Sequence, residues 1–272
     1  MRIIDGAYII ESVRNLFIEL NYCPQSLKNI SFVKQEMSEE ERELSEVLDE
    51  NMLKAKKEQR PLCQDCGVAQ VFIKKGKFAS FSDAHDLASL INRGVELAYR
   101  DGLLRKSTVA DPFERKNEGK NLPAFIHLEE CEGETLELWG LVKGGGSENV
   151  SALKMLAPSE GRAGVADFVF ETINLAAGKG CPPYFVGVGV GGTFDSVSFV
   201  AKKALLKKSN EDSELHELIE ERIKKLSFGT LGFPGISAVK AVYIKKEPTH
   251  IAMMPVAVAL NCHSFRCGKI VI

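Results

Sequence analysis

Three of the seven cysteines in this 272-residue sequence stand where sulfur could do chemistry. Cys63, Cys181 and Cys262 each lie at the end of an expected element, beside glycine, proline or polar residues. Functional residues gather at such positions, whereas a purely structural cysteine usually lies within an element. Three thiolates could bind one zinc ion, or three irons of a cubane cluster whose fourth iron stays open to a ligand. The spacing alone favours neither site.

Cys63 also forms a C-x-x-C pair with Cys66, in the stretch PLCQDCG. Such a pair is typical of a redox dithiol or of half a zinc site. A disulfide framework is not expected, because the cysteine count is odd and a reducing compartment keeps thiols free. Cys23 and Cys131 lie in less distinctive surroundings and are expected to be structural.

Glycine is concentrated in two segments, and the first could bind an anion. Gly144, Gly145 and Gly146 stand between Lys143 and Ser147, after an expected strand and before an expected helix. Glycines let the backbone approach a ligand closely, and the first turn of a helix offers unpaired N–H groups to an anion. The alternative interpretation is a flexible turn.

The second glycine segment, residues 187–192, formally matches the dinucleotide pattern G-x-G-x-x-G. Two features weaken a nucleotide-binding interpretation. Gly187 and Gly189 fall inside an expected strand instead of at its end. The acidic residues about 20 positions further on introduce a helix, whereas the pattern needs an acid at the end of a second strand.

Composition and charge argue against several classes of protein. The formal net charge is only −2, which does not favour a nucleic-acid partner held by bulk charge. Asp5 and Glu11 interrupt the apolar N-terminal stretch, unlike a signal peptide. No stretch approaches the roughly 18 uncharged apolar residues of a membrane span, so we expect a cytoplasmic protein.

Helical patterns dominate the first 60 residues. Apolar residues at helical spacing predict a helix over residues 3–20. Ser38-Glu39-Glu40-Glu41 is a capping box, which predicts the start of a second helix that continues to about residue 59. We therefore expect an N-terminal helical segment, residues 1–60.

Residues 61–272 mix strand and helix patterns, and we expect one compact α/β body with a mixed sheet. Runs 123–130 and 135–142 flank a turn and predict a hairpin. Further strands are predicted at 68–73, at 184–190 and on both sides of Glu247-Pro248. Helices are predicted from Asp83, Ser147, Pro158, Thr193 and Ser213.

Long stretches of this body resemble one family. The chain is similar to the class I, iron–sulfur-dependent fumarate hydratases, in particular to the α-type half that they share with L-tartrate dehydratase. The stretches that carry the resemblance occur in order over most of residues 60–266: PLCQDCG, LRKSTVADP, KNLPAFIH, KGGGSEN, GKGCPPYFVGVGVGG and EPTHIAMMPVAVALNCHSFR.

The resemblance implies that Cys63, Cys181 and Cys262 hold a 4Fe–4S cluster whose fourth iron binds substrate. The family commonly has threonine where this chain has Cys66, so the C-x-x-C pair is expected to be incidental. Cys267 likewise stands where histidine is frequent. These departures, with those at Glu118, at Lys120 and in the LGFPGIS loop, leave the identity of the substrate open.

The implied chemistry is the reversible hydration of fumarate to L-malate, which needs a Lewis acid, cations for two carboxylates and a proton donor. By resemblance, Asp65 protonates the departing hydroxide, with Gln64 beside it at the site. Asn261 and His263 are weaker candidates for supporting the ligands. The substrate-binding residues implied are Gln64, Asp65, Arg105, Lys143, Gly144, Gly145, Gly146 and His250.

The resemblance also implies a partner. Single-chain members of the family carry a further C-terminal domain with the catalytic base, whereas this sequence ends shortly after Cys262. We therefore expect an α subunit that works with a separate β subunit, as a dimer of such pairs. The alternatives are an L-tartrate dehydratase or another hydroxy-dicarboxylate lyase subunit, a zinc-binding structural partner subunit, and a nucleotide-binding protein.

Overall fold

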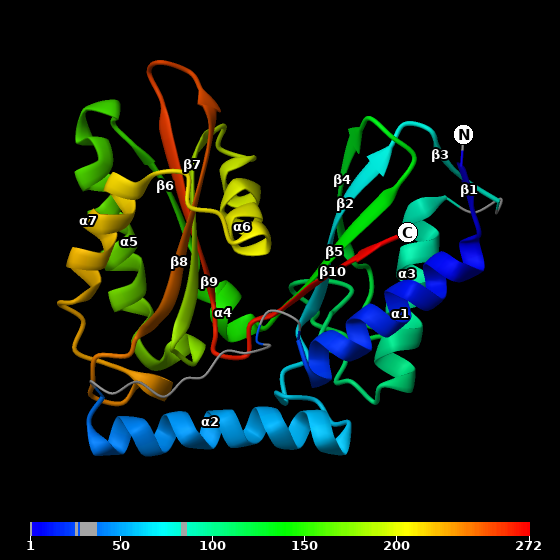
Figure 1. Cartoon of the computed structure of the whole chain (residues 1–272), viewed down its shortest axis with the longest axis horizontal. Coiled ribbons are helices and arrows are strands. Elements are labelled where there is room, and N and C mark those ends of the chain that lie inside the picture. Colours follow the sequence, from blue (N-terminus) through cyan, green and yellow to red (C-terminus); the bar gives the residue numbers. More distant parts are fainter. Residues whose placement is uncertain (1, 25–26, 28–36, 83–85) are drawn as a thin grey trace. The chain divides into compact units, whose positions relative to one another are not determined.

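The computed structural model describes residues 2–24, 27, 37–82 and 86–272, and Figure 1 shows the order of their elements. The chain divides into two compact units, each made of discontinuous sequence. The first unit comprises Met1–Ile30, Glu50–Gly145 and Ser264–Ile272, and the second comprises Ser31–Asp49 and Gly146–His263. The expected division of the chain into an N-terminal helical segment, residues 1–60, and an α/β body, residues 61–272, stays a prediction.

A mixed four-stranded sheet forms the centre of the first unit. Its strands are β2 (Val68–Gly76), β4 (Phe125–Cys131), β5 (Leu136–Lys143) and β10 (Arg266–Val271), in the order β10-β5-β2-β4. β2 runs parallel to β4 and antiparallel to β5, which in turn pairs antiparallel with β10. The chain thus returns to this sheet at its C-terminal end.

The predicted hairpin of residues 123–130 and 135–142 is wrong, although both strands form. β2 lies between β4 and β5 and pairs with both, as a buried strand can because its backbone N–H and C=O groups point to both edges. The connecting turn crosses the end of β2 and is held there by backbone bonds from Gly76 N to Thr135 O and from Lys77 N to Cys131 O. A tight hairpin would leave these groups unpaired.

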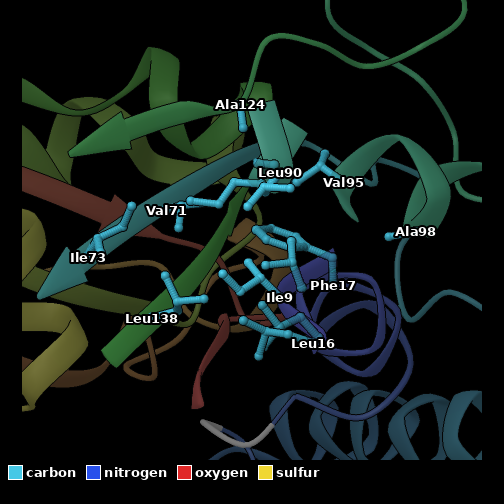
Figure 2. Packing of buried hydrophobic residues seen from close by; sticks show 14 of the residues in the cluster. Ile9, Leu16, Phe17, Val71, Ile73, Leu90, Val95, Ala98, Ala124 and Leu138 are labelled. Atoms are coloured by element: carbon cyan, nitrogen blue, oxygen red, sulfur yellow. The ribbon is translucent and has the colours of Figure 1, made fainter. Parts of the chain in front are cut away.

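Two helices, α1 (Gly6–Tyr22) and α3 (Leu87–Asp101), pack together over this sheet. Figure 2 shows Ile9, Leu16 and Phe17 of α1 in one apolar cluster with Val71 and Leu138 of the sheet. Burial of such side chains stabilises the unit by about 1.5–3 kcal/mol each. The site loops described below are therefore supported by a well-packed core.

Helices α1 and α3 both begin later in the sequence than predicted. Residues 2–4 form β1 (Arg2–Ile4), which pairs parallel with β3 (Ala79–Phe81), so α1 begins only after its cap, Asp5. The cap of α3 is Asp86, whose carboxylate accepts the N–H of Ser89 at 2.8 Å. The predicted cap Asp83 lies outside the described residues.

A second four-stranded sheet, β6-β9-β7-β8, forms the centre of the second unit (Figure 1). β7 runs parallel to β8 and antiparallel to β9, and β6 pairs with the other edge of β9. Helices α5 and α7 share the apolar core of one face, and α6 packs against β7 and β9. The bounds are β6 (Ala152–Leu156), α5 (Gly161–Ala176), β7 (Tyr184–Gly192), α6 (Val197–Lys207), α7 (Ser213–Ile223), β8 (Val239–Thr249) and β9 (Met254–Asn261).

Close packing of a helix against β7 accounts for the glycines of this strand. A Cβ on Gly189 would lie 2.5 Å from the backbone N of Ala201, and one on Gly187 would collide with the Ala201 carbonyl. Helix α6 can therefore approach β7 closely only because these positions lack a side chain. This arrangement accounts for the G-x-G-x-x-G match without a dinucleotide.

The remaining helices are α2 (Glu39–Glu58) and the short α4 (Gly145–Asn149). The predicted cap of α2 is confirmed, since Glu41 N donates to Ser38 Oγ at 3.2 Å. α4 begins at Gly145, two residues before the predicted cap Ser147. The mixed α/β fold with an N-terminal helical part is confirmed, and among the described residues we find no helix with the length and apolarity that crossing a membrane demands.

Candidate functional site

The loop that carries Cys63 connects α2 to β2, and we call residues 61–67 the Cys63 loop. Its backbone is anchored by residues distant in sequence. Leu62 N donates to Asn21 O at 2.7 Å, and the Tyr99 hydroxyl bonds to the Cys66 and Gly67 carbonyls at 2.6 and 3.0 Å. Fixed carbonyls leave the loop few alternative conformations, so the side chains that it projects are held in place.

Asp65 brings the Cys63 loop and the glycine-rich segment together. Its Oδ1 accepts the N–H of Gly67 and its Oδ2 the N–H of Gly145, both at 2.9 Å. A Cβ on Gly144 would lie 2.8 Å from Oδ2, so this position must be glycine if the carboxylate is to sit there. Two bonds to separate backbone segments fix the carboxylate in a defined orientation.

Arg105 lies in a segment that hydrogen bonds connect to the Cys63 loop. The carboxamide of buried Asn121 accepts the N–H groups of Ser107 and Thr108, at 2.6 and 3.0 Å, and donates to Gly67 O at 3.1 Å. Asn121 thereby ties the segment after Arg105 to the Cys63 loop. The Arg105 side chain itself is exposed, as a residue that binds an incoming anion must be.

Cys66 differs from Cys63 in its exposure to solvent. It is buried in the apolar core, whereas Cys63 is half-buried. Burial raises the pKa of the Cys66 thiol, although the backbone N–H of Arg105 donates to its sulfur and opposes the shift. The thiol lies 3.7 Å from the Cys63 carbonyl. A thiol kept neutral in this way is a poor nucleophile and metal ligand.

Lys143 and Arg266 are two fully buried cations on neighbouring strands of the first unit. Lys143 ends β5, and Arg266 begins β10 opposite Val142. Sequence reasoning predicted Lys143 and missed Arg266. The available signal was a charged residue between Phe265 and Cys267, a pattern that predicts a buried charge and therefore a special role.

In the second unit, the structure brings Cys181 and Cys262 together. The carbonyl of Cys181 accepts the N–H of His263 at 3.1 Å. Burial raises the pKa of Tyr184 to about 12, and negative charge on the two cysteines adds to the rise. Both sulfurs therefore lie close enough to one phenol to act on it electrostatically.

The turn before Cys181 is held by the same tyrosine. The Tyr184 hydroxyl donates to Ala177 O at 2.9 Å and accepts the N–H of Gly180 at 3.0 Å. Cys181 itself takes the left-handed conformation with φ 57°, which turns the chain sharply after the 3-10 helix η3 (Ala177–Gly180). Its side chain is exposed, unlike that of a structural cysteine.

His250 lies away from these two cysteines. It follows β8 in the exposed turn to β9, where its Nδ1 accepts the N–H of Ala252 at 3.2 Å. Cys262 comes directly after the other end of β9, and a strand of this length spans roughly 25 Å. Within the second unit, the structure thus does not bring His250 to the cysteine pair.

The cysteines fit a thiolate-bound group in their chemistry. Cys63 belongs to the first unit and Cys181 and Cys262 to the second, and none of the three is buried. Asn261, next to Cys262, has a buried Nδ2 that meets no acceptor among the described residues, and sulfide or thiolate sulfur would provide one. In the described part of the chain, no three His, Cys, Asp or Glu side chains form a metal-binding group.

Comparison with known proteins gives one consistent result. The family model of fumarate hydratase (Fumerase) matches residues 10–271. A Methanocaldococcus jannaschii protein, named as a candidate L(+)-tartrate dehydratase subunit alpha, is 39% identical over 259 residues, which are 90% of this chain and 90% of that protein. The Escherichia coli L(+)-tartrate dehydratase subunit alpha is 32% identical over 233 residues, 82% of this chain and 76% of that protein.

Proposed function

Because this chain belongs to the fumarate hydratase (Fumerase) family of hydro-lyases, we propose that it is the α subunit of a 4Fe–4S enzyme that reversibly adds water to fumarate to give L-malate. The observation that carries the proposal is the Asp65 carboxylate, fixed between the Cys63 loop and the glycine-rich segment. A second candidate substrate is L(+)-tartrate, favoured by the names of the two relatives.

Asp65 is the proposed catalytic residue. Each of its carboxylate oxygens accepts one backbone N–H, which leaves the other lone pair of each oxygen available. In the elimination direction, an Oδ atom carries the proton that leaves with the substrate hydroxyl as water. In the hydration direction, the same atom takes a proton from the attacking water. Gln64, the exposed neighbour of Asp65, is proposed to hydrogen-bond the substrate.

The substrate carboxylates need cations and N–H donors. The exposed guanidinium of Arg105 suits a carboxylate because it can donate two parallel hydrogen bonds. Lys143, which is buried and directly precedes Gly144, is proposed to add positive charge next to the glycine-rich segment. Gly144, Gly145 and Gly146 add backbone N–H groups. His250 lies at the far end of β9 from Cys262, and its role in substrate binding stays a prediction.

Cys63, Cys181 and Cys262 are the proposed ligands of the cluster. When bound, a cluster with three protein ligands supplies a Lewis acid that polarises the substrate hydroxyl and one carboxylate. The exposed or half-buried thiols of these residues suit ligation, and the raised pKa of Cys66 does not. The buried Nδ2 of Asn261 would stabilise sulfur next to Cys262.

A separate β subunit is the proposed partner, and we infer a dimer of α–β pairs. The support is that relatives covering most of this chain are named as alpha subunits. In this arrangement, the β subunit supplies the second member of the acid–base pair and further cations for the dicarboxylate.

The test is anaerobic purification of the chain together with its β subunit, followed by iron and sulfide counts and assays on L-malate, fumarate and L(+)-tartrate. We expect about four irons and four sulfides per α subunit, as a cubane cluster requires, with turnover of a four-carbon dicarboxylate. Stoichiometric zinc without sulfide would instead support the zinc-binding structural subunit. The ratio of kcat/KM for malate and tartrate decides between the two substrates.

A further inference from the structure

Arg266 is a buried cation that the proposed reaction does not yet use. It begins β10 in the first unit and is only 2% exposed. Burying a guanidinium is costly unless its N–H groups find partners, so such a residue is kept where its hydrogen bonds do something that a neutral side chain cannot.

The guanidinium joins three segments that are distant in sequence. Its Nη1 donates to the backbone carbonyl of Asp65 at 2.7 Å and to the carboxamide oxygen of Asn21 at 3.1 Å. Asn21 lies near the end of α1, is fully buried and is itself held by a bond from Nδ2 to Phe17 O at 2.9 Å. The carbonyl of the same Asn21 accepts the N–H of Leu62. α1, β10 and the Cys63 loop therefore meet at Arg266.

The second terminal nitrogen of the guanidinium, Nη2, lies near Gly144. A Cβ built on Gly144 would lie 3.6 Å from Arg266 Nη2 and 2.8 Å from Asp65 Oδ2. The guanidinium and the Asp65 carboxylate thus border the same small volume. Both acceptors of Nη1 are neutral, so the positive charge is left to act on this volume.

We infer that Arg266 is a positioning residue for Asp65, an inference that rests on the proposed function. Its bond to the Asp65 carbonyl sets the orientation of that peptide, and with it the direction in which the carboxylate leaves the backbone. A planar guanidinium can hold Asp65 O and Asn21 Oδ1 from one nitrogen in fixed geometry. A lysine ammonium keeps the charge but defines these directions poorly.

The test uses Arg266→Lys in the anaerobically prepared α–β enzyme. We expect kcat to fall by about 10²-fold, because small displacements of a catalytic group have effects of this order. We expect KM, and the inhibition constant of the non-reacting dicarboxylate succinate, to change by less than about threefold, because the binding cations are untouched. Iron and sulfide counts should equal those of the wild type.

Arg14→Lys is the matched control. Arg14 is a partly exposed arginine of the same unit, paired with Asp101 at 2.7 Å, and its replacement should leave kcat, KM and the cluster unchanged. A second test variant, Asn21→Ser, removes the outer acceptor of Arg266 together with the bond from Asn21 Nδ2 to Phe17 O, and leaves the guanidinium in place. It should lower kcat by a smaller factor and again spare the inhibition constant, which keeps the inference testable if Arg266→Lys folds poorly.

Three outcomes for the variants would overturn this inference alone. Wild-type kcat in Arg266→Lys would show that Asp65 does not need the guanidinium. A tenfold or larger rise in the succinate inhibition constant would make Arg266 a substrate-binding residue instead. Loss of iron or of the folded state from both variants, with normal kcat per cluster, would leave it a structural residue. A wild-type enzyme with a full cluster and no dicarboxylate turnover would overturn the proposed function, and this inference with it.

Discussion

At the scale of single residues, the two cysteines of the C-x-x-C pair have opposite environments. Cys63 is half-buried on a loop that the protein holds from several sides, whereas Cys66 is packed in the core beneath it. The thiol of Cys66 is also bonded to the Arg105 N–H and lies near the Cys63 carbonyl. A threonine hydroxyl could make the same two contacts, so the position asks for a small hydrogen-bonding side chain and not for a second reactive thiol.

This difference predicts distinct effects of serine. Cys63→Ser should abolish iron and sulfide binding, because it removes a proposed ligand. Cys66→Ser should retain the cluster, because the hydroxyl replaces the buried thiol in its hydrogen bonds. Iron and sulfide counts on anaerobically prepared variants provide the measurement. Equal loss in both variants would restore the dithiol or metal-pair interpretation.

Replacement of Asp65 separates chemistry from cluster binding. Asp65→Asn keeps an acceptor for only one of the two backbone N–H groups and cannot carry the proton, so kcat should fall by about 10²–10⁴-fold. Iron and sulfide should remain at wild-type levels. Asp86→Asn is the control, because Asp86 also accepts a backbone N–H, as the cap of α3, and asparagine caps helices equally well. Retained turnover in Asp65→Asn would remove Asp65 from the proposed acid–base role.

At the scale of elements, close packing of a helix on a strand explains the spacing of the β7 glycines, and a charged residue caps helix α7. The glycines of β7 accommodate α6, so their spacing is a packing requirement. Helix α7 is capped by Asp212, which accepts the N–H of Leu215 at 3.0 Å and also bonds to Arg162 and Lys246. Each feature predicts a measurable effect on stability.

Gly189→Ala should destabilise the fold. The added methyl would meet the backbone of Ala201 in α6, and such overpacking usually costs about 1–3 kcal/mol. Unfolding of the wild-type and variant proteins in denaturant measures the change in the free energy of unfolding. Ser198→Ala, at an exposed position of the same helix, should change the free energy of unfolding by less than about 0.5 kcal/mol. An unaffected Gly189→Ala would leave the glycine without a packing role.

Asp212 predicts a pH-dependent contribution to stability. Bonds to Arg162 hold its pKa well below the ordinary value, and Lys246 adds to the effect despite burial. A depressed pKa stabilises the folded state above the unfolded pKa, roughly 3.9, and this contribution is lost as the pH falls towards the folded value. Asp212→Asn keeps the cap but loses the ion pairs.

We therefore expect Asp212→Asn to lower the free energy of unfolding at pH 7 by on the order of 1 kcal/mol, because the arginine partner is half exposed. The difference from wild type should shrink below about pH 4. Asp212→Ala should cost about 1 kcal/mol more at all pH values, since it also removes the cap. A difference that stays constant with pH would show that the ion pairs contribute nothing.

At the scale of the whole molecule, each unit has its own sheet and core, and the proposed site residues are divided between them. Cys63, Asp65, Arg105 and Lys143 belong to the first unit, and Cys181 and Cys262 to the second. Two of the passages between the units, at the glycine-rich segment and after His263, adjoin proposed functional residues.

The proposed division of labour predicts that the β subunit controls turnover and not cluster binding. The α subunit prepared alone should contain iron and sulfide but have little or no hydro-lyase activity, because the second acid–base group is missing. Addition of the β subunit should raise kcat by at least about 10²-fold, the usual contribution of one such group. Full activity of the α subunit alone would contradict the proposal.

The sequence by itself determined the type of most elements and the local surroundings of the cysteines. The capping residues of α2, the apolar run of β7 and the glycine turn before Cys181 act over a few neighbouring residues, so their patterns are visible along the chain. The resemblance on motif stretches likewise led to the family that comparison confirmed. The roles of the individual site residues remain predictions.

Only the tertiary structure decided which segments meet. It placed β2 between β4 and β5, returned β10 to the first sheet, and put His250 at the far end of β9 from Cys262. Arg266 and Asn21 are 245 residues apart in sequence, yet their hydrogen bond helps to hold the Cys63 loop. Strand pairing and buried polar contacts of this kind satisfy donors and acceptors from distant segments, and no local pattern of residues specifies the partner.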